Sequence, residues 1–357
     1  TLYTSGHGTE AMLVTLDGAQ VHNWKVAYSD IWNETSPIKN PQPDDFLYMR
    51  KAELLPDGGL LAILVATGDT PWGYGMVKLD KDSNIVWSYL GQTHHDFDIA
   101  ADGRVYGLTH EMRNTTFEKH PQITVPRLDD FVVVLSPEGE ELKKVSVIDA
   151  LVRSRYEWLL NRVSWYNKHD FIHTNNIDLV EAAEVEALPF AEEGQVLLSF
   201  RDIDTIALLD IDKEEIVWAM RGNWFGQHDP DILPNGNILL FDNGNHRNGP
   251  DAASFSRAIE LELDFDAMTA RKVWEYRHEP DLYAECCSSV DRLENGNTLV
   301  VFGSEEEIVP VGQTFTVVEA DSEGNAVWEA EITAAGKMIQ YRGYPADQIM
   351  GETAVDR

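Results

Sequence analysis

The sequence predicts an all-β fold, a six-bladed β-propeller of four-stranded antiparallel blades, on three observations. Hairpins with an apolar strand, an Asx-Gly turn and a second apolar strand recur along the chain, as around Gly103 and Gly236. A strand pair ending in an aliphatic-x-Trp pattern precedes such hairpins, as at Trp87 and Trp218. No Pro/Ser-rich linker divides the 357 residues. Asx-Gly between alternating apolar residues is a strong hairpin signal, and regular repetition of strands is typical of propellers.

The repeat assigns the strands in order. The Trp-type strand pairs run over residues 12–24, 75–87, 131–145, 206–218, 259–274 and 316–328. The turns of the intervening hairpins contain Gly58, Gly103, Gly194, Gly236 and Gly296. Six copies of the strand pair indicate six blades, and we expect the N-terminal strands to close the ring against the last blade. The recurring tryptophans should pack between blades.

We expect residues 1–357 to form a single domain, because a propeller accommodates this length in one ring. The longest departure from the repeat is around residues 146–169. Apolar residues at helical spacing there, including Leu151 and Leu159, predict a helical or loop insertion. No apolar run is long enough to cross a membrane.

A net charge of −33 makes nucleic-acid binding improbable, since binding phosphates needs clustered Lys and Arg. It is typical of a soluble protein in a saline or extracellular setting, and we expect a periplasmic or secreted location. The first residue is Thr1, so a signal peptide could have been removed. The sequence leaves the oligomeric state open.

Two cysteines, Cys286 and Cys287, are adjacent. Neighbouring cysteines rarely meet ordinary disulfide geometry, so no disulfide framework is expected. A buried small-residue role is favoured, with a redox or ligand role as the alternative.

Histidines recur at one position of the repeat. His95 and His228 each precede their turn glycine, Gly103 and Gly236, by eight residues. His173 enters a third hairpin with the same four-residue step to an apolar residue, Ile177. Equivalent positions in a radially repeated fold meet near its axis, so we predict that the three imidazoles face one site. A single such histidine would more often be a packed structural residue.

Hairpin geometry extends this site. Residues equidistant from the turn lie side by side in an antiparallel pair, so Arg201 should neighbour His173, and Asn243 should neighbour His228. His110 should in the same way neighbour His95. Further candidates for substrate binding are His94, Arg50, Arg247 and Trp224, and Trp72, Tyr74 and Tyr283 are possible lining residues of the site entrance. On so acidic a chain, this set of cations and imidazoles indicates an anion site.

The residues resemble a known family. His94-His95-Asp96, His173-Thr-Asn175 followed by Ser199-Phe-Arg201, and Gln227-His228 ahead of Asn-Gly-Asn-Ile-Leu-Leu-Phe-Asp-Asn-Gly occur in the order found in bacterial arylsulfate sulfotransferases. The resemblance spans about residues 1–328. It implies a six-bladed propeller that moves a sulfuryl group from a phenolic sulfate ester to another phenol without phosphoadenosine phosphosulfate. It also implies that His228 is the nucleophile that forms a sulfohistidine, while His95 or His94, His173 and Arg201 bind the sulfuryl oxygens.

The implied chemistry is physically consistent. Sulfuryl transfer resembles phosphoryl transfer, which depends on positioning and on countering charge at three oxygens. Arg201 offers a rigid fork of donors, and a histidine with an ordinary pKa of about 6.5 can attack as neutral imidazole. Covalent capture gives ping-pong kinetics. We expect an aryl sulfate donor, a phenolic acceptor, and neither a metal nor another cofactor.

Three alternatives stay open at this point. Converging histidines could bind Zn²⁺ in a metallohydrolase. A polysaccharide lyase could use a His or Tyr base with Arg neutralising a uronate. A non-catalytic propeller could capture a sulfated or carboxylated ligand. Metal content, unsaturated sugar products and anion binding without turnover would distinguish them.

Overall fold

The structure, a computed structural model, describes residues 2–15, 19–162, 169–245, 247, 255–264, 267–303, 314–333 and 340–344. The chain divides into two compact units. The first unit comprises Thr1–His95, Cys287–Asp321 and Ala326–Arg357, and the second comprises Asp96–Cys286 and Ser322–Asn325.

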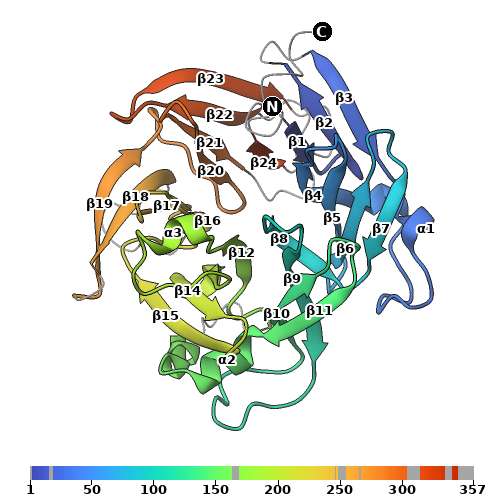
Figure 1. Cartoon of the computed structure of the whole chain (residues 1–357), viewed down its shortest axis with the longest axis horizontal. Helices are drawn as coiled ribbons and strands as arrows, with labels where there is room; N and C mark the ends of the chain where they lie inside the picture. The colour runs from blue at the N-terminus through green and yellow to red at the C-terminus, as the bar shows by residue number, and fades with distance from the viewer. Residues whose placement is uncertain are drawn as a thin grey trace. The chain divides into compact units, whose positions relative to one another are not determined.

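The first unit contains three four-stranded sheets (Figure 1). Their strands, in sheet order, are β24 (Gln340–Tyr344), β1 (Leu2–Ser5), β2 (Glu10–Val14) and β3 (Gln20–Lys25); β4 (Leu47–Leu54), β5 (Leu60–Ala66), β6 (Gly73–Leu79) and β7 (Ile85–Tyr89); and β20 (Ser289–Arg292), β21 (Thr298–Phe302), β22 (Thr314–Ala320) and β23 (Ala326–Thr333). Two short helices, α1 (Tyr28–Ile31) and η1 (Asp44–Phe46), precede β4.

The second unit contains the remaining sheets and helices. The strands, in sheet order, are β11 (Glu141–Ser146), β10 (Arg127–Leu135), β9 (Val105–Arg113) and β8 (Thr93–Ile99), whose first three residues belong to the first unit; β12 (Thr174–Leu179), β13 (Val196–Phe200), β14 (Thr205–Asp210) and β15 (Glu215–Arg221); and β16 (His228–Ile232), β17 (Ile238–Asp242), β18 (Arg257–Asp264) and β19 (Thr269–Tyr276). The helices are α2 (Val147–Arg153), η2 (Glu157–Arg162), α3 (Ala182–Val185) and η3 (Arg201–Ile203).

The predicted all-β propeller of four-stranded antiparallel blades is confirmed. Within the described residues, blades of four consecutive strands number five, not six. The remaining sheet is composite, because β1 pairs with β24 from the C-terminal end of the chain. The N-terminal strands therefore close against a strand that follows the last Trp-type strand pair. A total of six blades, which counts this composite sheet, stays a prediction.

Helices occupy part of the predicted insertion. Ser146 caps α2 by accepting the backbone N–H of Asp149 on its hydroxyl, a favourable arrangement at a helix start. The apolar face of α2 contacts β10, β11 and β15 (Figure 1). It joins a core that also contains Leu159 and Leu160 of η2. Among the described residues, no helix is long and apolar enough to cross a membrane.

The outer-strand tryptophans differ in burial. Trp24 and Trp218 are buried, whereas Trp87 is partly exposed. Trp24 packs with residues of the neighbouring blade in one core cluster and donates its indole N–H to Gly58 O at 3.2 Å. This contact confirms packing between blades for Trp24.

Carboxylates join the inner strands of the second unit. Asp98 Oδ2 accepts the N–H of Leu179 at 2.7 Å, and Asp178 Oδ2 accepts the N–H of Ile232 at 2.8 Å. Leu179 and Ile232 are therefore equivalent residues of successive blades, and each ends its strand. Each bond satisfies a backbone donor that would otherwise be buried without a partner.

This equivalence corrects one prediction. Counting four residues back from Ile232 gives His228, but the same count from Leu179 gives Asn175. His173 thus lies two residues before the repeat position. The sequence analysis aligned Ile177 with Ile232, but the residue of β12 that corresponds to Ile232 is Leu179, the last residue of the strand.

Candidate functional site

The inner strands β12 and β16 begin with irregular backbone. The pairing register shifts between Thr174 and Asn176 in β12, and between His228 and Asp231 in β16. His173 and Asp229 have φ angles of 49° and 53°, a left-handed conformation that non-glycine residues seldom adopt. Bulges of this kind re-aim side chains and are frequent beside active sites. Irregular backbone is therefore a shared feature of inner-strand entries, since His95 in β8 also has a positive φ angle, of 51°.

His228 at the start of β16 has a defined tautomer. Its Nδ1 lies 2.8 Å from Asn243 Oδ1 and 3.2 Å from Gly226 O. Asn243 Nδ2 donates to Ala284 O at 2.9 Å, which fixes the orientation of the Asn243 amide. The atoms that contact His228 Nδ1 are therefore two acceptors, Asn243 Oδ1 and Gly226 O. The hydrogen-bond pattern thus assigns the proton to Nδ1 and the lone pair of the neutral ring to Nε2.

The peptide that carries His228 is held by buried polar groups. The carbonyl of Gln227 accepts Asn175 Nδ2 at 2.9 Å and Ser199 Oγ at 3.3 Å. Gln227 Nε2 in turn donates to Ser199 Oγ at 2.9 Å. Asn175 and Gln227 are each fully buried, so this network fixes the backbone from which the imidazole projects. It also joins the entry of β12 to the entry of β16.

His173 is bound by a carboxylate. Its Nδ1 lies 2.5 Å from Asp170 Oδ2, three residues earlier in the chain. Arg201 follows β13 and donates its backbone N–H to His173 O at 3.2 Å, so the predicted neighbours do lie together. The Arg201 Nη1 is 3.4 Å from Asp202 Oδ1, and its buried Nε has no hydrogen-bond partner among the described residues. A buried guanidinium N–H is a strong donor to an anion.

The charges of this cluster follow from burial and pairing. Burial would lower the pKa of His173, but the charge and hydrogen bond of Asp170 outweigh it and raise that pKa. Burial would likewise raise the pKa of Asp170, yet the charge and hydrogen bond of His173 lower it. Burial lowers the pKa of His110 to about 3, and burial together with the charge of Asp170 raises that of Asp130 to about 8. The His173–Asp170 contact therefore favours the ion pair, whereas His110 and Asp130 are neutral at neutral pH.

Two further predicted residues are Tyr283 and Arg247. Burial and the charge of Glu285 raise the pKa of Tyr283, and the charges of Arg201 and Arg247 oppose that rise. Tyr283 is 42% exposed, as a residue lining an entrance can be. Arg247 is held by Asp242 at 2.7 Å and lies over the Phe255 ring at 3.8 Å. Its contacts are those of a structural residue, and its predicted substrate role stays a prediction.

The first unit brings together three predicted residues. His94 Nδ1 and His95 Nδ1 are 2.8 Å apart, and both rings meet the edge or face of Trp72 in T-shaped contacts. The Arg50 guanidinium lies over the same indole at 5.1 Å. All three predicted residues are buried. The choice between His94 and His95, and the pairing of His95 with His110, stay predictions.

Two predicted aromatic residues are buried among other side chains. Trp224 is 1% exposed and packs with apolar residues such as Ile238 and Leu240, and its role in substrate binding stays a prediction. Tyr74 is also fully buried, and its hydroxyl donates to Asp69 Oδ2 at 2.5 Å. Large aromatic rings fill the space between blades, and the sequence pattern did not separate this role from a lining role.

The prediction that the two cysteines are buried is confirmed, and the prediction that they form no disulfide is wrong. Cys286 and Cys287 are buried, as expected, but both are disulfide-bonded, and they are the chain's only cysteines. Left-handed φ angles of 60° at Cys287 and 91° at Ser288 show a tight local turn. The expectation from ordinary disulfide geometry, which applies to cysteines separated in sequence, was therefore wrong for this adjacent pair.

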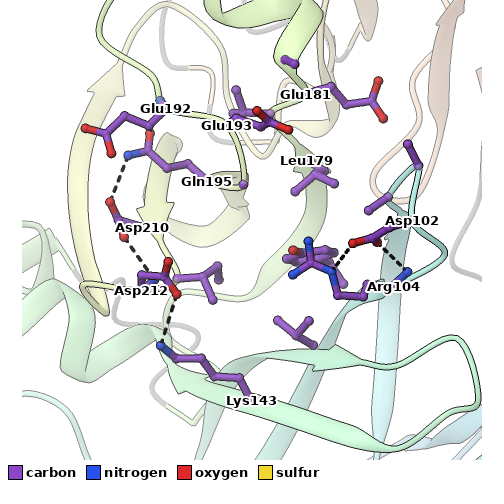
Figure 2. A pocket seen from close by; sticks show the side chains of 18 of the residues that line it. Asp102, Arg104, Lys143, Leu179, Glu181, Glu192, Glu193, Gln195, Asp210 and Asp212 are labelled. Atoms are coloured by element: carbon purple, nitrogen blue, oxygen red, sulfur yellow. Dashed lines mark hydrogen bonds and ion pairs between the residues drawn. The ribbon is translucent and has the colours of Figure 1, made fainter.

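A large pocket lies away from these residues. This cavity has a volume of about 840 Å³ and lies in the second unit, beside the end of β12 at Leu179. Figure 2 shows the side chains that line it. Its lining includes charged residues in ion pairs, such as Arg104 with Asp102 at 2.7 Å and Lys143 with Asp212 at 3.9 Å. None of the predicted site residues lines it. His173 precedes the start of β12, whereas the pocket lies at the other end of that strand. His228 begins β16, which does not line the pocket.

Sequence reasoning missed Asp170 as a site residue. Asp170 has no counterpart at the entries of the other inner strands, so the repeat gave no reason to select it. The available signal was its spacing of three residues before a candidate histidine. Asn175 and Gln227 were noticed only as parts of motifs, although both hold the His228 peptide.

The comparison with protein families decides the wider assignment. The model of the family described as Arylsulfotransferase (ASST) matches residues 51–333. The chain belongs to the arylsulfotransferase family. The matched range contains every predicted site residue except Arg50, which directly precedes it, and membership supports an arylsulfotransferase-like function in general.

The similarity to solved structures concerns the fold and not the function. A protein of unknown function from Bacteroides caccae is 12% identical with a TM-score of 0.54, and the alignment covers 93% of each chain. A functionally unknown protein from Desulfotomaculum acetoxidans is 9% identical with a TM-score of 0.47, over 94% of this chain and 80% of that chain. Virginiamycin B lyase from Staphylococcus aureus is 8% identical with a TM-score of 0.41, over 80% and 69%. No curated protein matches the chain.

Proposed function

We propose that this arylsulfotransferase family member transfers a sulfuryl group from a phenolic sulfate ester to a phenolic acceptor by a ping-pong mechanism, with a sulfohistidine at His228. The observation that carries the proposal is the contact of His228 Nδ1 with Asn243 Oδ1 at 2.8 Å. It keeps the ring proton on Nδ1, so the nucleophilic lone pair is on Nε2. Family membership supports the same reaction class.

In the first half-reaction, Nε2 attacks the sulfur of the donor and the S–O bond to the phenolic oxygen breaks. The ring then carries a positive charge, which its Nδ1–H shares with the Asn243 carbonyl oxygen. In the second half-reaction, the acceptor oxygen attacks sulfur and the S–N bond breaks, which restores the neutral imidazole. A covalent intermediate divides one difficult transfer into two easier steps.

Arg201 and His173 are proposed to bind the sulfuryl oxygens. The buried Arg201 Nε has no partner among the described residues, and an ionised His173 adds a second positive charge. Positive donors at a buried site stabilise the charge spread over a transferred group. His95 and Arg50 are assigned to substrate binding from the repeat register, with His94 as the alternative to His95 that the family resemblance allows, and His110 and Arg247 are kept as secondary candidates.

We also propose an extracytoplasmic location and a total of six blades. The location is supported by the disulfide-bonded Cys286 and Cys287, since disulfides persist in oxidising compartments. The blade count is supported by the composite sheet β24-β1-β2-β3, which has four strands like the other blades.

The function is tested with metal-stripped protein, 4-nitrophenyl sulfate as donor, and phenol as acceptor. We expect nitrophenol release that increases with phenol, and formation of phenyl sulfate. His228→Ala should abolish both products, while His278→Ala, which changes a histidine outside the site, should leave them unchanged. Activity that depends on an added divalent metal would indicate a metallohydrolase. Release of unsaturated products from a uronate polymer, without sulfuryl transfer, would indicate a lyase.

A further inference from the structure

Asp170 is a charged residue that the proposed roles leave unexplained. It lies in the segment that leads into β12, and its Oδ2 is 2.5 Å from Nδ1 of His173. Because a carboxylate only accepts while ionised, this contact requires the His173 proton on Nδ1. The proton available for a substrate is then the one on Nε2.

The backbone around His173 is fixed on both sides. Its carbonyl accepts the N–H of Arg201 at 3.2 Å, and the next residue, Thr174, donates its N–H to Asp130 Oδ2 at 2.8 Å. The φ angle of 49° at His173 fits this tight entry into the strand. With the main chain held in this way, the side-chain contact with Asp170 determines how the imidazole is turned.

The charges around the pair favour an ion pair. The groups that act on His173 are Asp170 and Asp202, which favour its charged form, and Arg201, which opposes it. His110 and Asp130 also belong to this cluster, and burial keeps both neutral near pH 7. Asp170 is therefore the carboxylate that balances the His173 imidazolium beside the Arg201 cation.

We propose that Asp170 is a positioning residue that holds His173 as an imidazolium with its Nε2–H directed at the phenolic oxygen, so that His173 protonates the leaving phenolate. This inference rests on the proposed sulfuryl transfer and names a second task within it. His228 forms the bond to sulfur, and the Asp170–His173 pair donates the proton to the leaving oxygen.

The proton balance is complete over both half-reactions. As the S–O bond of the donor breaks and the S–N bond to His228 forms, the His173 Nε2 proton passes to the phenolic oxygen, which leaves as a neutral phenol. His173 is then a neutral imidazole. The incoming phenol returns its proton to His173 Nε2 while its oxygen attacks sulfur. No external acid, metal or oxidant is needed.

The test measures how the Asp170→Asn variant depends on the leaving group. Donors should range from 4-nitrophenyl sulfate, whose phenolate leaves readily, to unsubstituted phenyl sulfate, whose phenolate needs protonation. Loss of a positioned general acid typically costs about 100-fold or more. We expect a loss of about that size in kcat for phenyl sulfate and of less than about threefold for 4-nitrophenyl sulfate. The alkaline limb of the kcat profile should also move to lower pH, since His173 loses the charge that favours its protonated form.

A matched control is Glu157→Gln. Glu157 contacts another histidine of the same unit, His120, at 3.3 Å, and this variant removes a histidine–carboxylate contact outside the site. It should show no leaving-group dependence. Asp170→Glu keeps the carboxylate but changes its reach, and should restore part of the activity on phenyl sulfate. That variant serves as the readout if Asp170→Asn does not fold.

The outcomes separate the two proposals. Wild-type protein that transfers no sulfuryl group would contradict the proposed function and, with it, the role of Asp170. Active wild-type protein with an equal loss for all donors in both Asp170 variants would overturn the positioning role alone. A loss that grows as the leaving group becomes poorer, with an unchanged Glu157→Gln control, supports it.

Discussion

The entries of β12 and β16 each present a histidine whose Nδ1 is bound by a side-chain oxygen, but the oxygens differ. At β16, His228 contacts the neutral amide of Asn243 at 2.8 Å. At β12, His173 contacts the carboxylate of Asp170 at 2.5 Å. An amide fixes the tautomer without adding charge, whereas a carboxylate favours the imidazolium. The comparison teaches that the group that contacts Nδ1, a neutral amide or a carboxylate, can determine whether a histidine acts as a nucleophile or as a cation.

The largest expected effect comes from removing the nucleophile. His228→Ala should lower kcat for sulfuryl transfer by at least about 1000-fold, more than loss of a single charge-stabilising donor. His173→Ala should retain more activity, especially with 4-nitrophenyl sulfate, because the nucleophile remains and the phenolate of this donor leaves without protonation. Steady-state rates for the two variants measure this difference. Equal losses on every donor would mean that the two histidines do not have distinct roles.

Arg201→Lys should come next. Lysine keeps the positive charge but loses the planar fork of donors, including the buried Nε. We expect kcat/KM to fall by about 100-fold, within the range for loss of one stabilising donor. Nitrophenol release at several donor concentrations provides the measurement. Near-normal kcat/KM would show that only net charge matters at this position.

Asn243→Asp makes the entry of β16 resemble that of β12. The introduced carboxylate would favour the charged, non-nucleophilic form of His228, and we expect activity to fall by about 10- to 100-fold near neutral pH, as for other residues that orient a functional histidine. The loss should shrink at higher pH, where the ring loses its extra proton. A pH–rate profile beside that of wild-type protein reveals this shift. A loss that is independent of pH would argue against a change in charge and for a packing defect.

The smallest effect concerns stability. Burial and the charge of Asp170 raise the pKa of Asp130 to about 8, above the ordinary value of 3.8. An acid that binds its proton more tightly when folded stabilises the fold at low pH, and this contribution is lost as pH rises from about 4 to about 8. Asp130→Asn can still accept the Thr174 N–H, so it should flatten that pH dependence. We expect it to stabilise the protein near pH 8 by on the order of 1 kcal/mol, roughly 2 °C in Tm.

Thermal unfolding of wild-type and Asp130→Asn protein between pH 4 and pH 8 tests this expectation. The matched control is Asp149→Asn, which removes an exposed carboxylate from α2 and should leave the pH dependence unchanged. A variant that is less stable than wild type at every pH would show that Asp130 stabilises the fold in its ionised form.

The sequence predicted the features that depend on turns. Counting from the Asn-Gly turn at Gly236 placed Asn243 beside His228, because register in a hairpin follows from its turn, and counting forward from Gly194 placed Arg201 at the end of β13, beside the entry of β12. It could not place Asp170, since the segment before β12 has no counterpart in the repeat. The bulge at Asn175 also shifted His173 from its predicted repeat position, and such insertions leave no clear trace in an apolar pattern.

The most direct test of the central claim is to trap the covalent intermediate. Wild-type protein would be mixed with 4-nitrophenyl sulfate without acceptor, quenched rapidly in base, and its intact mass and peptides measured. The account predicts a mass increase of one sulfuryl group, located on His228 and lost when phenol is added before the quench. The increase should be absent from His228→Ala. Product formation without any adduct, or a chase-competent adduct on another residue, would contradict a sulfohistidine at His228.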